Sequence, residues 1–174
     1  EELTALCELL ARYDVPLISD EIHADFVYAP ETFTSCLNVA KGRFITLTAA
    51  TKTFNLAGLQ QASIICRDKE LREKLQKHLD AVGVESGNIF ALTAVRTAYQ
   101  EGDAWLDGLL NYLDGNRKLL AELVKEHLPK AVLTPMEATY LGWLDLRAYG
   151  FTCDQLEKMT HEAGVAFTAG TFFG

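Results

Sequence analysis

The sequence predicts an α/β fold, because three short apolar segments of strand character lie between segments with helical periodicity. The strand segments are 14–19, 43–50 and 61–67, and the second is rich in residues that favour β-structure. In the third, residues 64–66 form a continuous apolar run. Such runs are typical of strands covered on both faces in a mixed or mostly parallel sheet. We therefore expect a sheet with helices on both faces.

The first helices are expected from apolar residues that recur every three or four positions. One covers the opening residues, before the first strand, and Pro16 marks its end. Its buried stripe consists of Leu3, Leu6, Cys7 and Leu10. Another covers 68–82, and Gly83 is placed to end it.

Further helices follow a loop that the composition of 83–88 predicts. Residues 90–99 are expected to form an apolar helix. Residues 103–127 are expected to form a long helix that stops before Pro129, although its two glycines lower the helix propensity.

The last part of the chain has the character of a smaller α+β unit. Segments 131–135, 139–146 and 164–168 are strand-like, and 152–164 is helical. The expected organisation is half of a larger α/β domain at 1–102, an inter-domain helix at 103–128 and part of a smaller domain at 129–174.

Composition excludes several classes of partner. The formal net charge is −8, which argues against nucleic acid or an anionic membrane as the main partner. The four cysteines contain no CxxC pair, so we expect reduced thiols rather than a disulfide framework or a zinc site. Without a signal peptide or an apolar run of membrane length, a cytoplasmic location is expected by default. The apolar character of both ends suggests an excerpt from a longer protein.

A cluster of three acids and a histidine follows the first strand: Asp20, Glu21, His23 and Asp25. One interpretation is a solvated loop. A second is a metal site, because Glu21, His23 and Asp25 would share one face if the strand continued through them. A third is a carboxylate that faces a cofactor, since ligands of open α/β sheets bind beyond the carboxyl ends of the strands. Asp20 is placed for this third role.

Lys52 follows the second strand among small neighbours and hydroxyl groups, including Thr48 and Thr51. Lysine is usually a surface residue. A lysine in a pocket, however, can act as a nucleophile toward aldehydes. Because Lys52 and Asp20 both follow strands, they could line one pocket.

Two segments, SDEIHADF and TAATKTFNLAGLQ, resemble the large-domain core of the fold-type I pyridoxal-phosphate enzymes, the aspartate aminotransferase superfamily. More narrowly, they are similar to the MalY/PatB branch of cystathionine β-lyases and other carbon–sulfur lyases. A third segment, EATYLGWLDLR, fits the small domain of that branch. The resemblance covers essentially the whole chain.

The resemblance implies pyridoxal 5'-phosphate as cofactor and assigns three residues to it. Lys52 matches the lysine that binds the cofactor covalently and serves as the base at the substrate Cα. Asp20 matches the aspartate that pairs with the pyridinium nitrogen. His23 occupies a position where many relatives place a tyrosine near the phenolic oxygen of the ring, although a core histidine is an alternative.

The phosphate-binding positions depart from the wider family. The position of a phosphate-binding arginine holds Gln60, and the position of a serine holds Ala49. Thr48 and Thr51 are the nearby hydroxyl candidates for the phosphate. Much of the phosphate site must therefore come from elsewhere in the protein.

Three further residues lie in recognisable segments. Tyr140 aligns with a segment that lines the active-site entrance in relatives, although core packing is an equal alternative. Arg147 is not matched to the arginine that binds the substrate carboxylate, and we expect a surface residue. Asn88 belongs to a loop that reaches a neighbouring subunit in the family.

The function that the resemblance implies is a lyase that cleaves a sulfur amino acid such as cystathionine into thiol, pyruvate and ammonia. An aminotransferase on the same scaffold is the first alternative, and a catalytically incomplete module is the second. A homodimer is implied by the resemblance alone.

Overall fold

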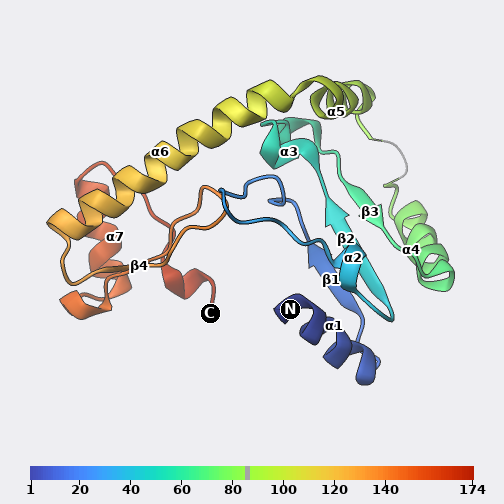
Figure 1. The fold of residues 1–174 in the computed structure, drawn as a ribbon, viewed down its shortest axis with the longest axis horizontal. Helices are drawn as coiled ribbons and strands as arrows, with labels where there is room; N and C mark the ends of the chain where they lie inside the picture. Colours follow the sequence, from blue (N-terminus) through green and yellow to red (C-terminus); the bar gives the residue numbers. More distant parts are fainter. Residues whose placement is uncertain (85–86) are drawn as a thin grey trace. The chain divides into compact units, whose positions relative to one another are not determined.

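The computed structural model describes residues 1–84 and 87–174, and these divide into two compact units (Figure 1). Unit 1 contains residues 1–113 together with 137–139, and unit 2 contains 114–136 together with 140–174. The loop predicted at 83–88 falls partly outside the described residues, since 85 and 86 are not among them. The two units are described separately.

Unit 1 is an α/β unit. Its strands are β1 (Leu17–Asp20), β2 (Phe44–Thr48) and β3 (Ser63–Ile65). Its helices are α1 (Glu2–Arg12), α2 (Cys36–Val39), α3 (Ala50–Thr53), the short η1 (Ala57–Leu59), α4 (Lys69–Ala81) and α5 (Ile89–Glu101). All three strands and all four helices that periodicity predicts for this part of the chain are present, counting the first half of α6 (Asp103–His127).

The sheet of unit 1 has the order β1-β2-β3 and is mixed. β1 runs parallel to β2, with Leu17 opposite Phe44, and β2 runs antiparallel to β3, with Thr46 opposite Ile65. This register puts Phe44 and Thr46 on one face, where both are buried.

The opposite face of the sheet is apolar but exposed within this chain. Ile18 and Ile64 lie on it, and they are 65% and 43% exposed. The buried face is covered from α2, where Cys36 Sγ lies 2.8 Å from Thr46 Oγ1. Apolar residues therefore occupy both faces, as the sequence predicts, and one face is covered by the described residues.

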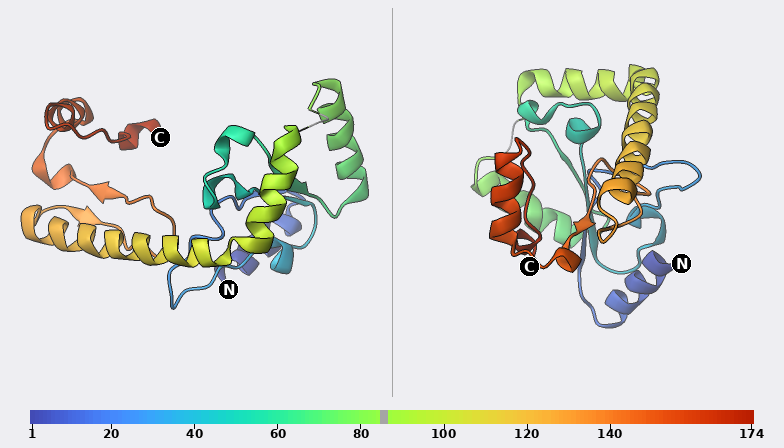
Figure 2. Two further views of the ribbon diagram at one scale, coloured as in Figure 1. Left: turned by 90° about the horizontal axis from the view of Figure 1, so that it is seen from above. Right: turned by 90° about the vertical axis from the view of Figure 1, so that its left-hand side faces the viewer.

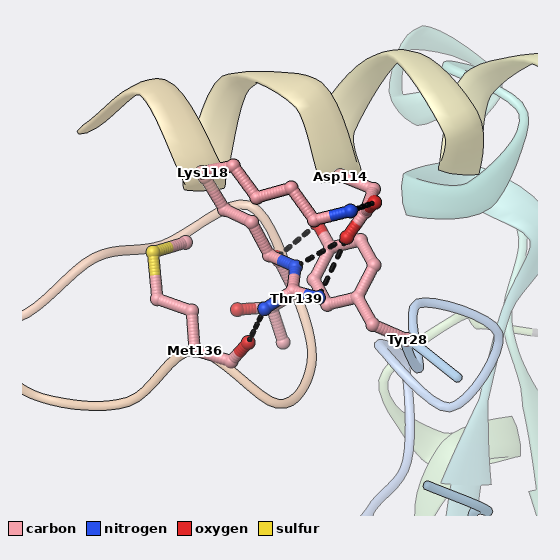
Figure 3. Close-up of polar contacts among 6 residues, drawn as sticks. Tyr28, Asp114, Lys118, Met136 and Thr139 are labelled. Carbon is pink, nitrogen blue, oxygen red and sulfur yellow. Dashed lines mark hydrogen bonds and ion pairs between the residues drawn. The ribbon is translucent and has the colours of Figure 1, made fainter. Parts of the chain in front are cut away.

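Unit 2 is built around the second half of α6. Figure 2 shows the whole of α6 as one continuous helix. The remaining elements of the unit are β4 (Val132–Leu133), β5 (Leu144–Asp145), η2 (Arg147–Tyr149), α7 (Cys153–Glu162) and η3 (Gly170–Phe172). β4 and β5 pair antiparallel. Lys118 on α6 pairs with Asp114 (Figure 3). Arg117, on the same helix, also pairs with Asp114 and donates to the carbonyl oxygen of Met136.

One predicted strand is wrong. Residues 165–168 of the segment 164–168 are neither helix nor strand. The backbone nitrogen of Val165 donates to Thr160 O at 2.8 Å, so the chain closes the end of α7 instead of extending beside another strand. A β-former stays a strand only when a neighbour completes its hydrogen bonds, and within 1–84 and 87–174 no strand pairs with this segment.

A short return of the chain completes unit 1. Residues 137–139 lie beside the segment after β1, where Tyr28 N donates to Glu137 O at 3.0 Å and Thr139 N donates to Phe26 O at 2.7 Å. The Tyr28 hydroxyl donates to Thr139 O at 2.7 Å (Figure 3). These bonds fix the stretch that follows the acidic cluster.

Candidate active site

The segments that follow β1 and β2 carry the residues of the candidate site. Asp20 is the last residue of β1 and pairs with Leu47 of the parallel strand β2. Lys52 lies on α3, which begins two residues after β2 ends, and Figure 1 shows α3 directly beyond that strand. Because β1 and β2 are adjacent and parallel, both residues follow strands at the same edge of the sheet.

The charged groups of Asp20 and Lys52 are exposed. Asp20 Oδ1 accepts a hydrogen bond from the backbone of Ile22 at 3.2 Å. Within 1–84 and 87–174 neither residue takes part in a salt bridge, and the Lys52 amine has no hydrogen bond. An amine and a carboxylate thus remain available to a ligand at this edge.

Glu21, the next residue, is buried. Its carboxylate accepts from the backbone of Cys36 at 2.8 Å and from the Ser19 hydroxyl at 3.1 Å. Burial alone would raise the pKa of Glu21, but hydrogen bonds from Ser35, Cys36 and Ser19 outweigh it and hold the pKa below its usual value. Glu21 is therefore an ionised anchor that ties the end of β1 to the start of α2.

The strand does not continue through the acidic cluster. Residues 22–25 form a turn, in which Ala24 N donates to Glu21 O and Phe26 N donates to His23 O, each at 3.0 Å. The alternation that would place Glu21, His23 and Asp25 on one face therefore does not apply. In the described part of the chain no group of three such side chains could hold a metal ion.

His23 lies in this turn and is half-buried, with its ring centroid 6.0 Å from that of Phe26. It comes three residues after Asp20, so the same edge of the sheet carries it. Its predicted place near the phenolic oxygen of the cofactor stays a prediction.

Asp25 makes a contact that the sequence did not predict. Thr53 Oγ1 donates to Asp25 Oδ2 at 2.7 Å, and Thr53 is fully buried. Asp25 also lies close enough to Tyr99 of α5 for its charge to act on the phenol. Burial, and then the Asp25 charge, raise the pKa of Tyr99, while the Thr48 side chain opposes the shift. No pattern of residue spacing could have identified this group, because its members are far apart in sequence.

The hydroxyl candidates for the phosphate have different surroundings. Thr48 ends β2 and interacts with Tyr99, whereas Thr51 lies half-buried on α3. Ala49 is buried and extended, with φ of −159°. Gln60 is exposed and left-handed, with φ of 53°. Thr48 thus precedes α3 and Thr51 lies on it. Their role toward phosphate remains a prediction.

The other singled-out residues lie elsewhere. Tyr140 belongs to unit 2 and is 41% exposed. Arg147, also in unit 2, is held by both carboxylate oxygens of Asp145 at 2.6–3.0 Å, in keeping with the expectation that it is a surface residue. Asn88 Oδ1 accepts from Phe90 N at 2.9 Å and caps α5.

Comparison with known proteins decides the family. The sequence model described as Aminotransferase class I and II matches residues 1–174. The chain belongs to this family. It is 35% identical over 178 residues to "Cystathionine beta-lyase PatB" of Bacillus subtilis (strain 168), which covers 100% of this chain and 46% of the relative. It is 34% identical over 176 residues to "Protein MalY" of Escherichia coli (strain K12), covering 100% of this chain and 45% of the relative.

A solved structure confirms the fold. Cystalysin from Treponema denticola, which contains a pyridoxal 5'-phosphate cofactor, superposes with a TM-score of 0.93 and 31% identity. The match covers 99% of this chain and 45% of cystalysin. The predicted resemblance to the fold-type I enzymes and to the MalY/PatB branch is confirmed, and the chain spans less than half the length of these relatives.

Proposed function

We propose that the protein containing this chain is a pyridoxal-phosphate-dependent carbon–sulfur β-lyase that acts on a sulfur amino acid such as cystathionine. The observation that carries the proposal is the placement of an exposed carboxylate and an exposed amine, Asp20 and Lys52, beyond the ends of two adjacent parallel strands. The relatives named cystathionine beta-lyase support the choice of reaction.

The chemistry of these groups fits the cofactor. A primary amine condenses with an aldehyde, and an ionised carboxylate stabilises a protonated ring nitrogen. Asp20 and Lys52 supply one group of each kind, and neither is neutralised by a salt bridge in the described residues. When bound, pyridoxal phosphate supplies an electron sink for charge that develops at the substrate Cα.

Each residue has one task in the proposed reaction. Asp20 keeps a proton on the ring nitrogen. Lys52 holds the cofactor by its amine and, once substrate has displaced it, removes the Cα proton. Lys52 would return that proton to the sulfur as the bond from Cβ to sulfur breaks, so that the thiol leaves. Water would then release the remaining three carbons as pyruvate and the nitrogen as ammonia. His23 and the hydroxyls of Thr48 and Thr51 are proposed to contact the ring oxygen and the phosphate.

The test is product formation from cystathionine by the full-length protein with pyridoxal phosphate. Thiol and pyruvate are expected in equal amounts without a keto-acid acceptor, and a Lys52→Ala variant should form both about 10²–10⁴-fold more slowly. An aminotransferase would need the acceptor and would release no thiol. Dependence on the acceptor would therefore overturn the lyase proposal and favour the alternative, which the family described as Aminotransferase class I and II also contains.

We also propose that the whole protein is a homodimer, as the family resemblance implies. In support, the start of α5 exposes large apolar side chains, with Ile89, Phe90 and Leu92 between 68% and 82% exposed. Surfaces of this kind are typical of interfaces.

A further inference from the structure

A partly buried hydrogen bond joins the turn after β1 to the helix that carries Lys52. Thr53 Oγ1 donates to Asp25 Oδ2 at 2.7 Å, and none of the Thr53 side chain is exposed. Thr53 directly follows Lys52, and Asp25 comes five residues after Asp20. One short bond therefore links the two segments that carry the proposed catalytic groups.

The helix that carries Lys52 needs such support. α3 has four residues, and Ala49, the N-cap residue before it, makes no side-chain capping bond. A helix of this length has little stability of its own, so its orientation depends on tertiary contacts. Bonds to a charged acceptor are stronger than bonds between neutral groups, which makes the Asp25 carboxylate an effective anchor.

Aromatic contacts also hold the C-terminal end of α3. The ring of Phe54, next after Thr53, lies 5.6 Å from Tyr99 and 5.7 Å from Trp105 between centroids. The charge of Asp25, which accepts the bond from Thr53, also contributes, after burial, to the raised pKa of Tyr99 on α5.

We propose that Asp25 and Thr53 form a positioning pair that fixes Lys52 for its reaction with the cofactor. The inference rests on the role of Lys52 proposed above. Neither residue needs to touch the cofactor. The pair sets the direction in which α3 presents the lysine relative to the turn after Asp20, and its loss lets the lysine sample unproductive directions.

The experiment uses the full-length apoprotein and measures how fast added pyridoxal phosphate becomes fixed to Lys52. The label is reduced with borohydride and mapped by mass spectrometry, and the absorbance of the holoprotein is titrated with pH. The variants are Thr53→Val, which keeps the shape but removes the hydroxyl, and Thr53→Ser, which keeps the hydroxyl. Thr32→Val, in the exposed loop before α2, is the matched control.

The expected result is capture that is roughly tenfold slower in Thr53→Val, the scale of one lost bond to a charged group. The pH midpoint of the holoprotein absorbance should also shift. Thr53→Ser and Thr32→Val should retain wild-type rates and midpoints. A purely structural role for Thr53 would lower the melting temperature without moving the midpoint of the folded protein.

The outcomes separate this inference from the proposed function. A wild-type protein labelled on another lysine would overturn the role of Lys52 itself. Wild-type labelling of Lys52 together with an unchanged rate in Thr53→Val would overturn the positioning pair alone, as would equal slowing in the Ser and Val variants. Should Thr53→Val fail to fold, Asp25→Asn decides, because a neutral acceptor weakens the bond without removing it. It is expected to slow capture several-fold, and a wild-type rate would refute the pair.

Discussion

Two sets of polar side chains lie at the same edge of the sheet and differ in one respect. Asp20 and Lys52 are exposed and carry charges that no salt bridge in the described residues neutralises. Glu21 and Thr53, each adjacent in sequence to one of them, are buried and hydrogen-bonded. In both segments that follow the strands, then, a buried, hydrogen-bonded residue directly follows an exposed one.

The difference indicates that the exposed residues act in the reaction, whereas the buried residues hold the structure around them. A buried polar group without a partner is costly, so Glu21 and Thr53 have fixed positions only while their partners hold them. An exposed charge carries no such cost and can change partners during a reaction. We expect substitutions in the exposed set to reduce chemistry at little cost in stability, and those in the buried set to reduce stability first.

The largest effect is expected for Lys52→Ala in the full-length protein. Loss of a positioned base costs about 10²–10⁴-fold in rate, and covalent capture of the cofactor should disappear as well. Stability should change by less than about 0.5 kcal/mol, because the side chain is exposed. The measurements are pyruvate release and denaturant unfolding. Lys69→Ala, an exposed lysine on α4, is the control and should stay fully active.

Asp20→Asn should slow the removal of the Cα proton while pyridoxal phosphate remains bound. A neutral amide cannot hold the proton on the ring nitrogen, and one or two pKa units of lost stabilisation correspond to roughly 1.4–3 kcal/mol, or about ten- to a hundredfold in rate. Exchange of the substrate Cα proton with solvent deuterium measures the step. Asp107→Asn, an exposed acid on α6, should exchange at the wild-type rate. Wild-type exchange in Asp20→Asn would remove that residue from its proposed role.

Much of this comparison could be predicted from the sequence, and the reasons are local. The apolar runs fix β1 and β2, and their ends fix Asp20 and Lys52 in sequence without any distant contact. The start of a helix could also be predicted from local sequence. α4 begins after Asp68, the first residue of the predicted range 68–82, and Asp68 caps the helix by accepting from Leu71 N at 2.8 Å.

The buried set could not be predicted, because its partners are distant in sequence. Asp25 and Thr53 are separated by 28 residues, and Glu21 and Cys36 by 15. Whether an acid after a strand faces solvent or a backbone donor depends on how the next segment folds back. The strand predicted at 164–168 failed for the same reason, since a partner and not a propensity decides it.

Glu21→Gln is expected to reduce stability by about 1–3 kcal/mol at neutral pH, since the amide cannot accept all the hydrogen bonds of the buried carboxylate. The effect depends on pH with a definite sign. The folded pKa of Glu21 is lowered, so its contribution is present above the unfolded pKa and is lost as the pH falls through the folded pKa. Urea unfolding of both proteins should therefore differ at pH 7 and converge in acid. A constant difference at all pH values would show that Glu21 acts by its shape and not its charge.

The smallest effect is expected in unit 2, at a pair with no proposed role in catalysis. Arg147 holds both oxygens of Asp145 and, by hydrogen bonding first, lowers the pKa of that carboxyl to about 2. Arg147→Gln should return the midpoint of Asp145 toward 3.8, as followed by NMR of the carboxyl carbon. Because the folded pKa is the lower one, any stabilisation by the pair is present above the unfolded pKa and disappears as the pH falls through the folded value. The arginine side chain is 91% exposed, so solvent screens the pair and little stability should be lost.

Lyase activity should be unchanged, and a large rise in KM for the amino acid would instead assign Arg147 to the substrate carboxylate, contrary to its place beside Asp145.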